Sequence, residues 1–330
     1  MTAENLSDTP RHIVIGGGSG FIGSALSAAL RARGDRVTLI SRQAGPGRIT
    51  WDALERDGLP ACDAVVNLAG RHILDPRRRW TERYRDEVIR SRVETTTLLV
   101  NRINEMTEPP AVFISTAGKC FYGTEAGAAE RRASYPELDE DSAPMGLDFP
   151  AELVGRWEKA ADHLDATRVR HVRLRIGIVL GSVEREGFIA KLWRIGRSRG
   201  LLPLIRLPFC MGLGAVIGTG RQPFPWVHID DMVGIVLKVI DDESAAGRYN
   251  CVAPGIVDNR TFMSALARHL RRPLLWRAPA WLVTGLVGAE RASILLEGQN
   301  VVPRRTIALG YDFRFPTLEP ALTNLVRITF

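Results

Sequence analysis

Three glycines spaced three residues apart lie in the segment HIVIGGGSGFIGSAL. A strand-like apolar run precedes them and a helical pattern follows, and this context favours a cofactor loop over a simple chain turn. Glycine is required where a backbone turns with unusual φ or touches a pyrophosphate, and a helix N-terminus offers N–H groups to phosphates. We therefore expect a dinucleotide-binding loop. Its contact residues are predicted to be Gly17, Ser19, Gly20, Phe21, Ile22 and Gly23.

The second predicted strand ends in TLISRQ, with Ser41 and Arg42 near its end. Folds that bind NAD usually place Asp or Glu there to hold the ribose 2′-hydroxyl. A carboxylate would repel the 2′-phosphate of NADP, whereas Arg pairs with a phosphate through two hydrogen bonds. A surface arginine in an arginine-rich chain is the alternative explanation. Because Ser41 adds a second short donor, we expect NADP(H) as the cofactor.

Other residues of the first half are candidates for contacts with the cofactor. Asp52 in ITWDAL could reach the adenine edge, and the small residues of VNLAG would let the backbone approach the adenosine half. Glu87 and Arg92 on the next predicted helix could face the cofactor, although each alone is typical of a helix surface. The candidates from these segments and from the strand AVFIST are Asp52, Leu68, Ala69, Gly70, Glu87, Arg92 and Ser115.

Composition excludes several classes of protein. The net charge is +7, but only four of the 44 basic residues are lysines, and the arginines are dispersed along the chain. An anionic small ligand explains this charge as well as a polymer, and we expect no nucleic-acid partner. The four cysteines show no C-x-x-C pair, which fits a reducing compartment, and no metal-ligand spacing occurs.

Membrane and targeting signals are also missing from the sequence. No apolar run reaches about 18 residues, so we expect no membrane span and no membrane partner. The first residues, MTAENLSDTPRH, lack an apolar core and an Arg-rich amphipathic pattern. We expect a cytoplasmic protein with a short disordered tail over residues 1–10, and leave an organellar location open.

The elements that must position these residues follow from hydrophobic periodicity. Continuous Val/Ile/Leu runs indicate strands buried on both faces, and helical crossovers indicate parallel pairing. The fold class is therefore α/β, a Rossmann-like doubly wound parallel sheet whose ligand lies at the C-terminal strand ends. Predicted strands are 12–16, 36–41, 64–69, 111–116, 172–180 and 248–253, and predicted helices are about 21–33, 80–104, 150–166 and 230–241.

The pattern becomes irregular after residue 180. The stretch GLGAVIGTGRQPFPW is a loop by composition, and Pro and Gly cut the C-terminal part into short helices. We assign 11–180 plus 225–253 to a cofactor-binding Rossmann domain. We assign 181–224 plus 254–330 to a smaller, mostly helical substrate lobe.

Several motifs resemble the extended short-chain dehydrogenases/reductases. GGGSGFIGSAL, VNLAG, PFPWVHIDDM and YNCVAP match this group, and GRITWDAL and LLEGQNVVPRRTIALGYDFRFPTLEPAL resemble its atypical epimerase-like subfamily. That subfamily is also described as nucleoside-diphosphate-sugar epimerase-like or cell-division-inhibitor-like. The resemblance covers about residues 11–328 and implies NADP(H) binding. It matches the cofactor positions of the family to Ser41, Arg42, Leu68, Ala69, Glu87 and Arg92.

The acid/base pair of the wider superfamily is missing from this chain. Its Tyr-x-x-x-Lys would fall near Pro150 and Val154 in LDFPAELVGRWEKAADH, and no such motif occurs anywhere. The Ser or Thr that partners this pair would fall near Ala117. The atypical subfamily shares the loss of the pair.

Three ionisable residues are candidates to replace the missing pair. Lys119 and Tyr122 lie in STAGKCFYG, after the strand whose end borders the nicotinamide in this fold. His228 in PWVHIDD borders the substrate cleft of extended reductases, and Asp230 is expected to cap the helix after it. A desolvated lysine can donate a proton to a carbonyl, but solvated, packing or backbone-bonded roles are the alternatives.

Two functions of different classes remain open. The first is an NADP(H)-dependent oxidoreductase acting on a small carbonyl or conjugated substrate. The second is a non-catalytic NADP(H)-sensing protein that regulates a protein partner. Sugar-nucleotide epimerisation ranks third because it depends on the missing tyrosine. The substrate and the oligomeric state are not specified by the sequence, and a homodimer through helices 80–104 and 150–166 is left open.

Overall fold

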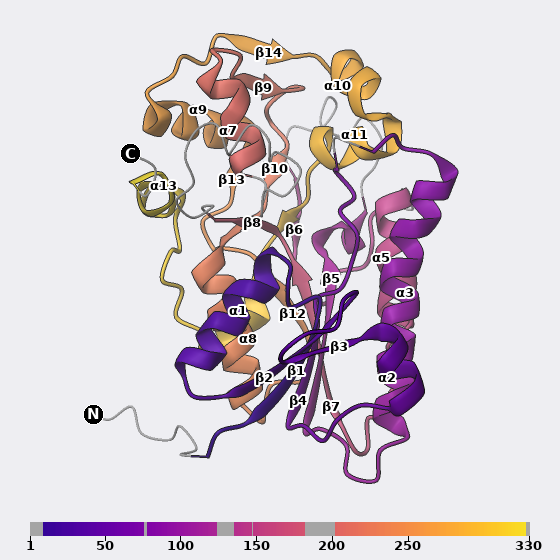
Figure 1. Cartoon of the computed structure of the whole chain (residues 1–330). Helices are drawn as coiled ribbons and strands as arrows, with labels where there is room; N and C mark the ends of the chain where they lie inside the picture. Colours follow the sequence, from indigo (N-terminus) through magenta and orange to yellow (C-terminus); the bar gives the residue numbers. More distant parts are fainter. Residues whose placement is uncertain (1–8, 76–77, 124–134, 147, 182–201, 328–330) are drawn as a thin grey trace, which may run out of the picture.

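The computed structural model describes residues 9–75, 78–123, 135–146, 148–181 and 202–327. Its centre is a parallel sheet of seven strands in the spatial order β3-β2-β1-β4-β5-β7-β12 (Figure 1). The strands are β1 (His12–Gly16), β2 (Arg36–Ser41), β3 (Arg48–Thr50), β4 (Ala64–Asn67), β5 (Val112–Gly118), β7 (Arg170–Ile176) and β12 (Gly247–Cys251). This order confirms the predicted Rossmann-like α/β fold. The chain runs outward in both directions from β1 and β4, so a crevice opens between their C-terminal ends.

Helices cover both faces of this sheet, as the continuous apolar strands require. α1 (Phe21–Ala32) and α8 (Ile229–Asp241) pack on one face, while α2 (Trp51–Asp57), α3 (Glu82–Asn104) and α5 (Phe149–Lys159) lie on the other (Figure 1). Alternate residues of one strand pack on opposite faces of the sheet, because successive side chains of a strand point in opposite directions. In β1, Ile13 and Ile15 pack toward α1 and α8, while Val14 packs toward α3.

A second group of elements lies beyond the C-terminal edge of the sheet (Figure 1). Its core brings together Phe224, Trp226, Phe262 and Leu322, which lie far apart in the sequence. Two short paired sheets, β9 with β14 and β10 with β13, tie the segments to each other. The elements are α7 (Leu202–Cys210), β9 (Ala215–Ile217), β10 (Pro223–Phe224), β13 (Val257–Asp258), α9 (Asn259–Leu270), β14 (Trp276–Ala278), α10 (Ala280–Val287), α11 (Ala289–Leu296) and α13 (Leu318–Arg327).

The remaining short elements connect the sheet to this second group. β8 (Ile178–Leu180) continues the line of β7 after Gly177 and pairs with β11 (Trp226–His228). The other short elements are a 3₁₀ helix, η1 (Lys119–Tyr122), two strands, β6 (Glu137–Leu138) and β15 (Asn300–Val301), and one helix, α12 (Arg304–Ala308). Within the described residues, no helix is long and apolar enough to cross a membrane, and no His, Cys, Asp or Glu cluster is arranged to hold a metal.

Some predicted elements differ from the structure. The helix predicted over 150–166 ends at Lys159, and the residues after it form turns with i→i+3 hydrogen bonds. The stretch predicted as a loop over 212–226 contains β9 and β10, and β3 and α2 were not predicted. Residues 1–8 of the tail predicted over 1–10, and the part of the predicted substrate lobe over 182–201, lie outside the described residues.

Candidate functional site

The glycine loop after β1 touches the loop after β4 with no side chain between them. Gly17 has φ +75°, and a Cβ built on it would lie 2.7 Å from the backbone carbon and oxygen of Leu68. A Cβ on Gly23 would lie 2.6 Å from the carbonyl oxygen of Gly17, so the loop also packs against the first turn of α1. Larger residues would separate these loops.

The N-terminus of α1 points its free N–H groups toward this crevice. Gly20 precedes the helix, no side chain caps it, and its first turn contains no acidic residue. The uncapped N–H groups and the helix dipole together favour an anion at this position. The loop predicted to bind phosphate therefore lies at the carboxyl edge of β1, and its role stays a prediction.

The cation predicted to bind the cofactor, Arg42, directly follows β2. The Arg42 side chain is exposed and makes no hydrogen bond or ion pair with the described part of the chain. Ser41 precedes it, and its hydroxyl donates to the Gln43 carbonyl at 2.5 Å, which shapes the turn. Arg42 is thus available to a ligand, while Ser41 has a local partner.

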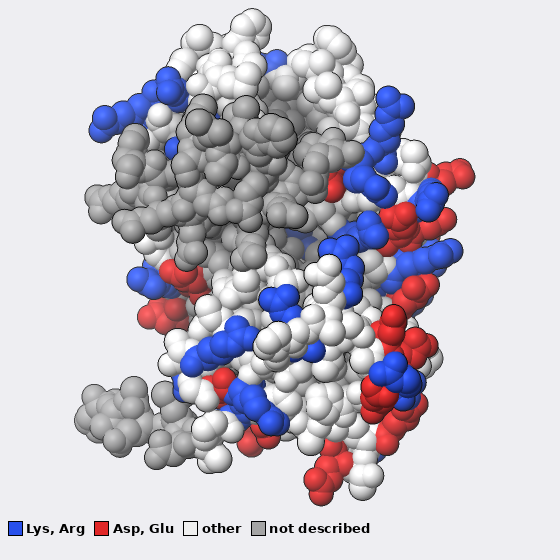
Figure 2. Space-filling view, in the orientation of Figure 1, with Lys and Arg blue, Asp and Glu red and all other residues white. Residues whose placement is uncertain are grey.

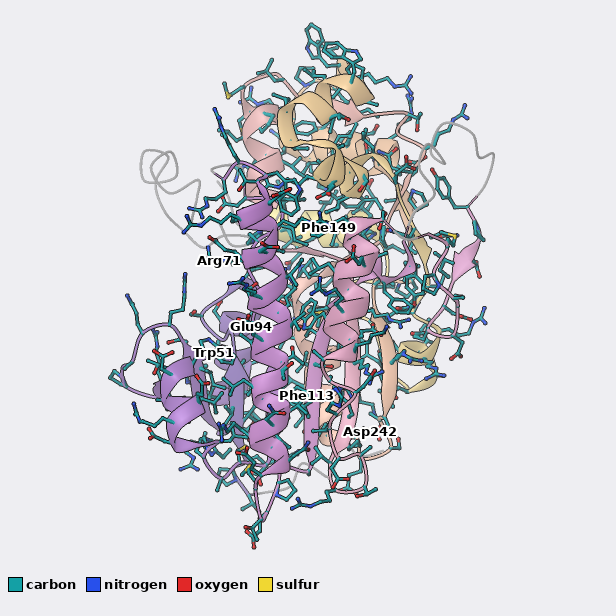
Figure 3. All side chains as sticks on the ribbon, turned by 90° about the vertical axis from the view of Figure 1, so that its right-hand side faces the viewer. Trp51, Arg71, Glu94, Phe113, Phe149 and Asp242 are labelled. Carbon is teal, nitrogen blue, oxygen red and sulfur yellow. The ribbon has the colours of Figure 1, made fainter. Side chains whose placement is uncertain are left out.

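The strand β3 and the helix α2 cover the adjacent edge. Thr50 caps α2 by accepting from the Ala53 N–H at 3.0 Å, and Asp52 lies exposed in the first turn. The indole of Trp51 reaches within 3.2 Å of the position of a Cβ on Gly16 (Figure 3 labels Trp51). Asp52 is therefore exposed at the start of α2, directly after β3, and its contact with the cofactor stays a prediction.

Helix α3 places a second cation, Arg92, beside the loop after β4. A Cβ on Gly70 would lie 3.0 Å from the Arg92 guanidinium carbon, and this guanidinium donates to the Arg71 carbonyl at 2.8 Å and lies 5.2 Å from the ring of Trp157. Burial lowers the pKa of Arg92 to about 10, and no carboxylate of the described chain pairs with it. A cation without a counter-ion beside a ligand-facing loop is suited to bind an anion.

A buried polar network fixes this loop, and the sequence reasoning missed it. Asn67 is fully buried, donates to the Thr96 hydroxyl at 2.9 Å and accepts from the Ala69 N–H at 3.1 Å. The indole of Trp157 donates to the same Thr96 hydroxyl at 3.0 Å. The sequence signal was a polar residue at the end of the buried strand AVVN.

Two predicted cofactor residues have protein partners instead. Glu87 forms ion pairs with Arg71 at 3.2 Å and Arg78 at 3.3 Å in a surface network. Ser115 is buried within β5, and its hydroxyl lies 2.8 Å from Nε2 of His171. Ser115 shares the sheet face of Phe113, which packs against the helices and stacks on His171.

Buried apolar side chains occupy the position of the missing acid/base pair. α5 begins at Phe149, where Asp148 caps it by accepting from the Ala151 N–H at 2.8 Å. Val154 is 4% exposed, and its methyl carbon lies 3.6 Å from the position of a Cβ on Gly118, at the end of β5. Pro150 is also buried. The helix is present, but the relay of the superfamily is absent from it.

Lys119 is the candidate donor that lies directly at the end of β5. It begins η1 and is 5% exposed, and its ammonium donates to the Gln299 amide oxygen at 2.5 Å. The Gln299 amide nitrogen donates in turn to the Gly123 carbonyl at 3.2 Å. The ammonium therefore has a neutral partner and no carboxylate among the described residues.

Tyr122 lies in a buried structural network, which argues against its predicted role as a proton donor. The hydroxyl is fully buried, lies 2.8 Å from both the Asp139 carbonyl and the Asn250 side-chain oxygen, and accepts from the Arg175 guanidinium at 3.2 Å. The same guanidinium pairs with Glu158 at 2.8 Å. Burial raises the pKa of Tyr122, and its bonding capacity is used by the protein.

His228 also has a structural position. Its Nδ1 accepts from the Asp230 N–H at 3.1 Å, so His228 rather than Asp230 caps α8. The ring is 1% exposed and lies 3.9 Å from the ring of Phe315. Burial lowers the pKa of His228, which keeps it neutral, while Asp230 pairs with Arg314 at 3.2 Å. The structure favours a helix cap over a proton donor.

The chain resembles proteins of a known family along most of its length. Residues 13–145 match the NAD dependent epimerase/dehydratase family, and residues 278–325 match a domain of unknown function, DUF1731. The epimerase family protein SDR39U1 of Homo sapiens is 43% identical over 95% of this chain and 99% of its own length. The epimerase family protein YfhF of Bacillus subtilis is 29% identical over 96% and 98%.

A solved structure shares the complete architecture. The crystal structure of human SDR39U1 (isoform 2) with NADPH superposes with a TM-score of 0.85 at 42% identity, covering 96% of this chain and 99% of that one. Both the sheet and the second group of elements are thus shared. The chain belongs to the epimerase family, the NAD-dependent epimerase/dehydratase group, as an SDR39U1-like protein.

Proposed function

We propose that this chain is an NADP(H)-dependent oxidoreductase acting on a small carbonyl or conjugated substrate without the usual Tyr-x-x-x-Lys pair. The observation that carries the proposal is the free cation Arg42 beside the bare glycine loop, where Gly17 meets Leu68. The human relative crystallised with NADPH has the same fold and supports the same cofactor here.

The crevice offers a distinct partner for each charged part of the cofactor. The uncapped N-terminus of α1 binds the pyrophosphate, and Arg92 adds a positive charge beside the loop of Gly70. Arg42 pairs with the 2′-phosphate, which would be repelled by the carboxylate that NAD-specific folds carry. Asp52 lies at the rim near the adenosine end.

The reacting end lies at Gly118 and Lys119, where β5 ends. NADPH supplies a hydride to the electrophilic carbon of the substrate when it is bound. Lys119 donates a proton from its ammonium to the oxygen that gains the charge, or to the α-carbon of a conjugated system, and is reprotonated by water. Its neutral partner Gln299 leaves the ammonium free of a competing carboxylate.

The test is NADPH oxidation by the intact protein against a panel of aldehydes, ketones and conjugated carbonyl compounds. We expect at least one substrate-dependent loss of NADPH absorbance, strongly reduced in Lys119→Met. NADPH binding without turnover on any class of the panel would overturn the proposal.

A second candidate is a non-catalytic protein whose NADP(H) state regulates a protein partner. It is favoured by one observation: the Tyr122 hydroxyl is committed to internal hydrogen bonds. Its signature would be NADPH affinity that changes when a partner is added, with no consumption of NADPH. Epimerisation of a sugar nucleotide ranks third, because Val154 fills the place of the tyrosine-lysine relay.

The remaining partners follow from the surface charges. We propose a small-molecule substrate and no nucleic acid, since acidic and basic side chains alternate along the flank of α3 (Figure 2).

A homodimer through α3 and α5 would bury ion pairs such as Arg90–Glu94 and Arg156–Glu152, with Glu94 on the outward face of α3 (Figure 3). Sedimentation of the intact chain tests this interface.

A further inference from the structure

The end of the second group of elements exposes large apolar side chains. Trp276 is 62% exposed and Trp281 is 74% exposed, far more than is usual for tryptophan in a soluble domain. Their neighbours in this surface are exposed to a similar degree. We call this set the apolar tip, and its members are Met211, Leu213, Leu275, Trp276, Trp281 and Leu286.

Two chain segments that carry the tip meet at a short paired sheet. β14 pairs in parallel with β9, with Trp276 opposite Ala215, so Leu213 lies just before the paired residues. α10 follows β14 after Pro279 and presents Trp281 and Leu286 to solvent, while Val283 is buried beneath. Figure 1 shows β14 and α10 at the end of the molecule farthest from the sheet.

The segments that carry the tip contain basic residues and no acidic ones. Residues 202–229 and 259–289 contain seven arginines and not one Asp or Glu. Arg271 and Arg272 are exposed and make no ion pair with the described part of the chain, and Arg277 lies within β14 beside Trp276. The other arginines of these segments are Arg206, Arg221, Arg260 and Arg268. Arg268 pairs with Glu319 at 2.5 Å, so the tip combines apolar surface with the positive charge of Arg271 and Arg272, which pair with no carboxylate of the described chain.

This combination argues against a second copy of the chain as the occupant. Two tips packed together would bring arginine against arginine, with no carboxylate of these segments to pair with them. Exposed tryptophan side chains such as Trp276 of β14 and Trp281 of α10 are instead suited to the boundary between lipid headgroups and acyl chains. Arginines around them pair with anionic headgroups.

We propose that the apolar tip adsorbs to the surface of an anionic lipid bilayer. The tip inserts Trp276, Trp281 and Leu286 among the headgroups, and Arg271 and Arg272 bind lipid phosphates. The expectation that the chain has no membrane partner rested on the absence of a spanning segment. Adsorption needs no span, and it is independent of whether the crevice binds NADP(H).

The test is co-sedimentation of the full chain with vesicles. Binding is expected to vesicles rich in phosphatidylglycerol and to be much weaker with phosphatidylcholine alone. Each arginine near an anionic surface contributes about fivefold in partitioning, so Arg271→Gln with Arg272→Gln lowers binding about 30-fold. Trp281→Glu with Leu286→Glu removes insertion and is expected to lower it at least as much.

Matched controls separate the tip from general charge and apolarity. Ile307→Glu changes an apolar side chain that is 51% exposed on α12, beside β12, and Arg90→Gln removes an exposed arginine on α3. Both are expected to bind like wild type. Circular dichroism checks that every variant is folded.

Three outcomes would overturn the proposal. The first is no binding of the wild-type chain to anionic vesicles. The second is equal loss of binding in the tip variants and the controls. The third is a wild-type dimer that Trp281→Glu converts to a monomer, measured by light scattering, since this would assign the tip to a second copy of the chain.

Discussion

Replacement of Arg42 by alanine isolates the residue that we assign to the 2′-phosphate. Its guanidinium has no partner within the described chain, so removing it breaks no internal bond and the free energy of unfolding is expected to stay unchanged. A hydrogen bond to a charged group contributes about 1.5–3 kcal/mol. The dissociation constant for NADPH should therefore rise about 10- to 150-fold.

The assay is a calorimetric titration of each variant with NADPH and with NADH. NADH lacks the 2′-phosphate, so its affinity should be almost the same in wild type and Arg42→Ala. Arg90→Ala, which removes an exposed arginine on the outer face of α3, is the matched control and should bind both nucleotides normally. Unchanged NADPH affinity in Arg42→Ala would refute the assignment. An equal loss for NADPH and NADH would show that the effect does not pass through the 2′-phosphate.

Three further predictions follow from the buried groups. Lys119→Met should lower turnover about 10²- to 10⁴-fold and leave NADPH affinity intact. Tyr122→Phe should lower the melting temperature and leave the turnover per folded molecule near wild type. Loss of turnover in Tyr122→Phe with normal turnover in Lys119→Met would exchange their roles. Glu158→Ala leaves the Arg175 guanidinium buried without its counter-ion, so chemical denaturation should show a loss of about 3–5 kcal/mol, and a loss below 1 kcal/mol would contradict a buried pair. Burial lowers the pKa of His171 from 6.5 to about 3, so the unfolded chain binds a proton that the folded chain rejects. Stability should therefore fall as pH drops through this range, by at most about 1.4 kcal/mol per unit, and an unchanged slope in His171→Gln would exclude His171 as the source.

The central sheet could be predicted from the sequence because its strands are continuous apolar runs. β3 and α2 escaped prediction because three residues of strand and seven of helix give too short a pattern. The helix of α5 was predicted too long for a different reason. Ala161 and Leu164 keep the apolar spacing of a helix, but they pack under the sheet from turns.

The local structure around the residues predicted for the cofactor was easier to predict than the surroundings of the candidate proton donors. The packing of Gly17 and Gly23 and the place of Arg42 after a strand depend on local backbone, which the sequence displays directly. The surroundings of Tyr122 depend on Asn250, which is 128 positions away in the chain. Contacts at this separation leave no local pattern.

Transfer of a labelled hydride tests the proposed activity most directly. NADPH carrying deuterium at the transferable position is incubated with the intact protein and the panel of carbonyl and conjugated acceptors. The deuterium content of the products is then measured by mass spectrometry. We expect one deuterium in a reduced acceptor, and much less of this product with Lys119→Met. NADPH bound with high affinity but no deuterium in any acceptor would contradict the oxidoreductase assignment and favour the sensing role.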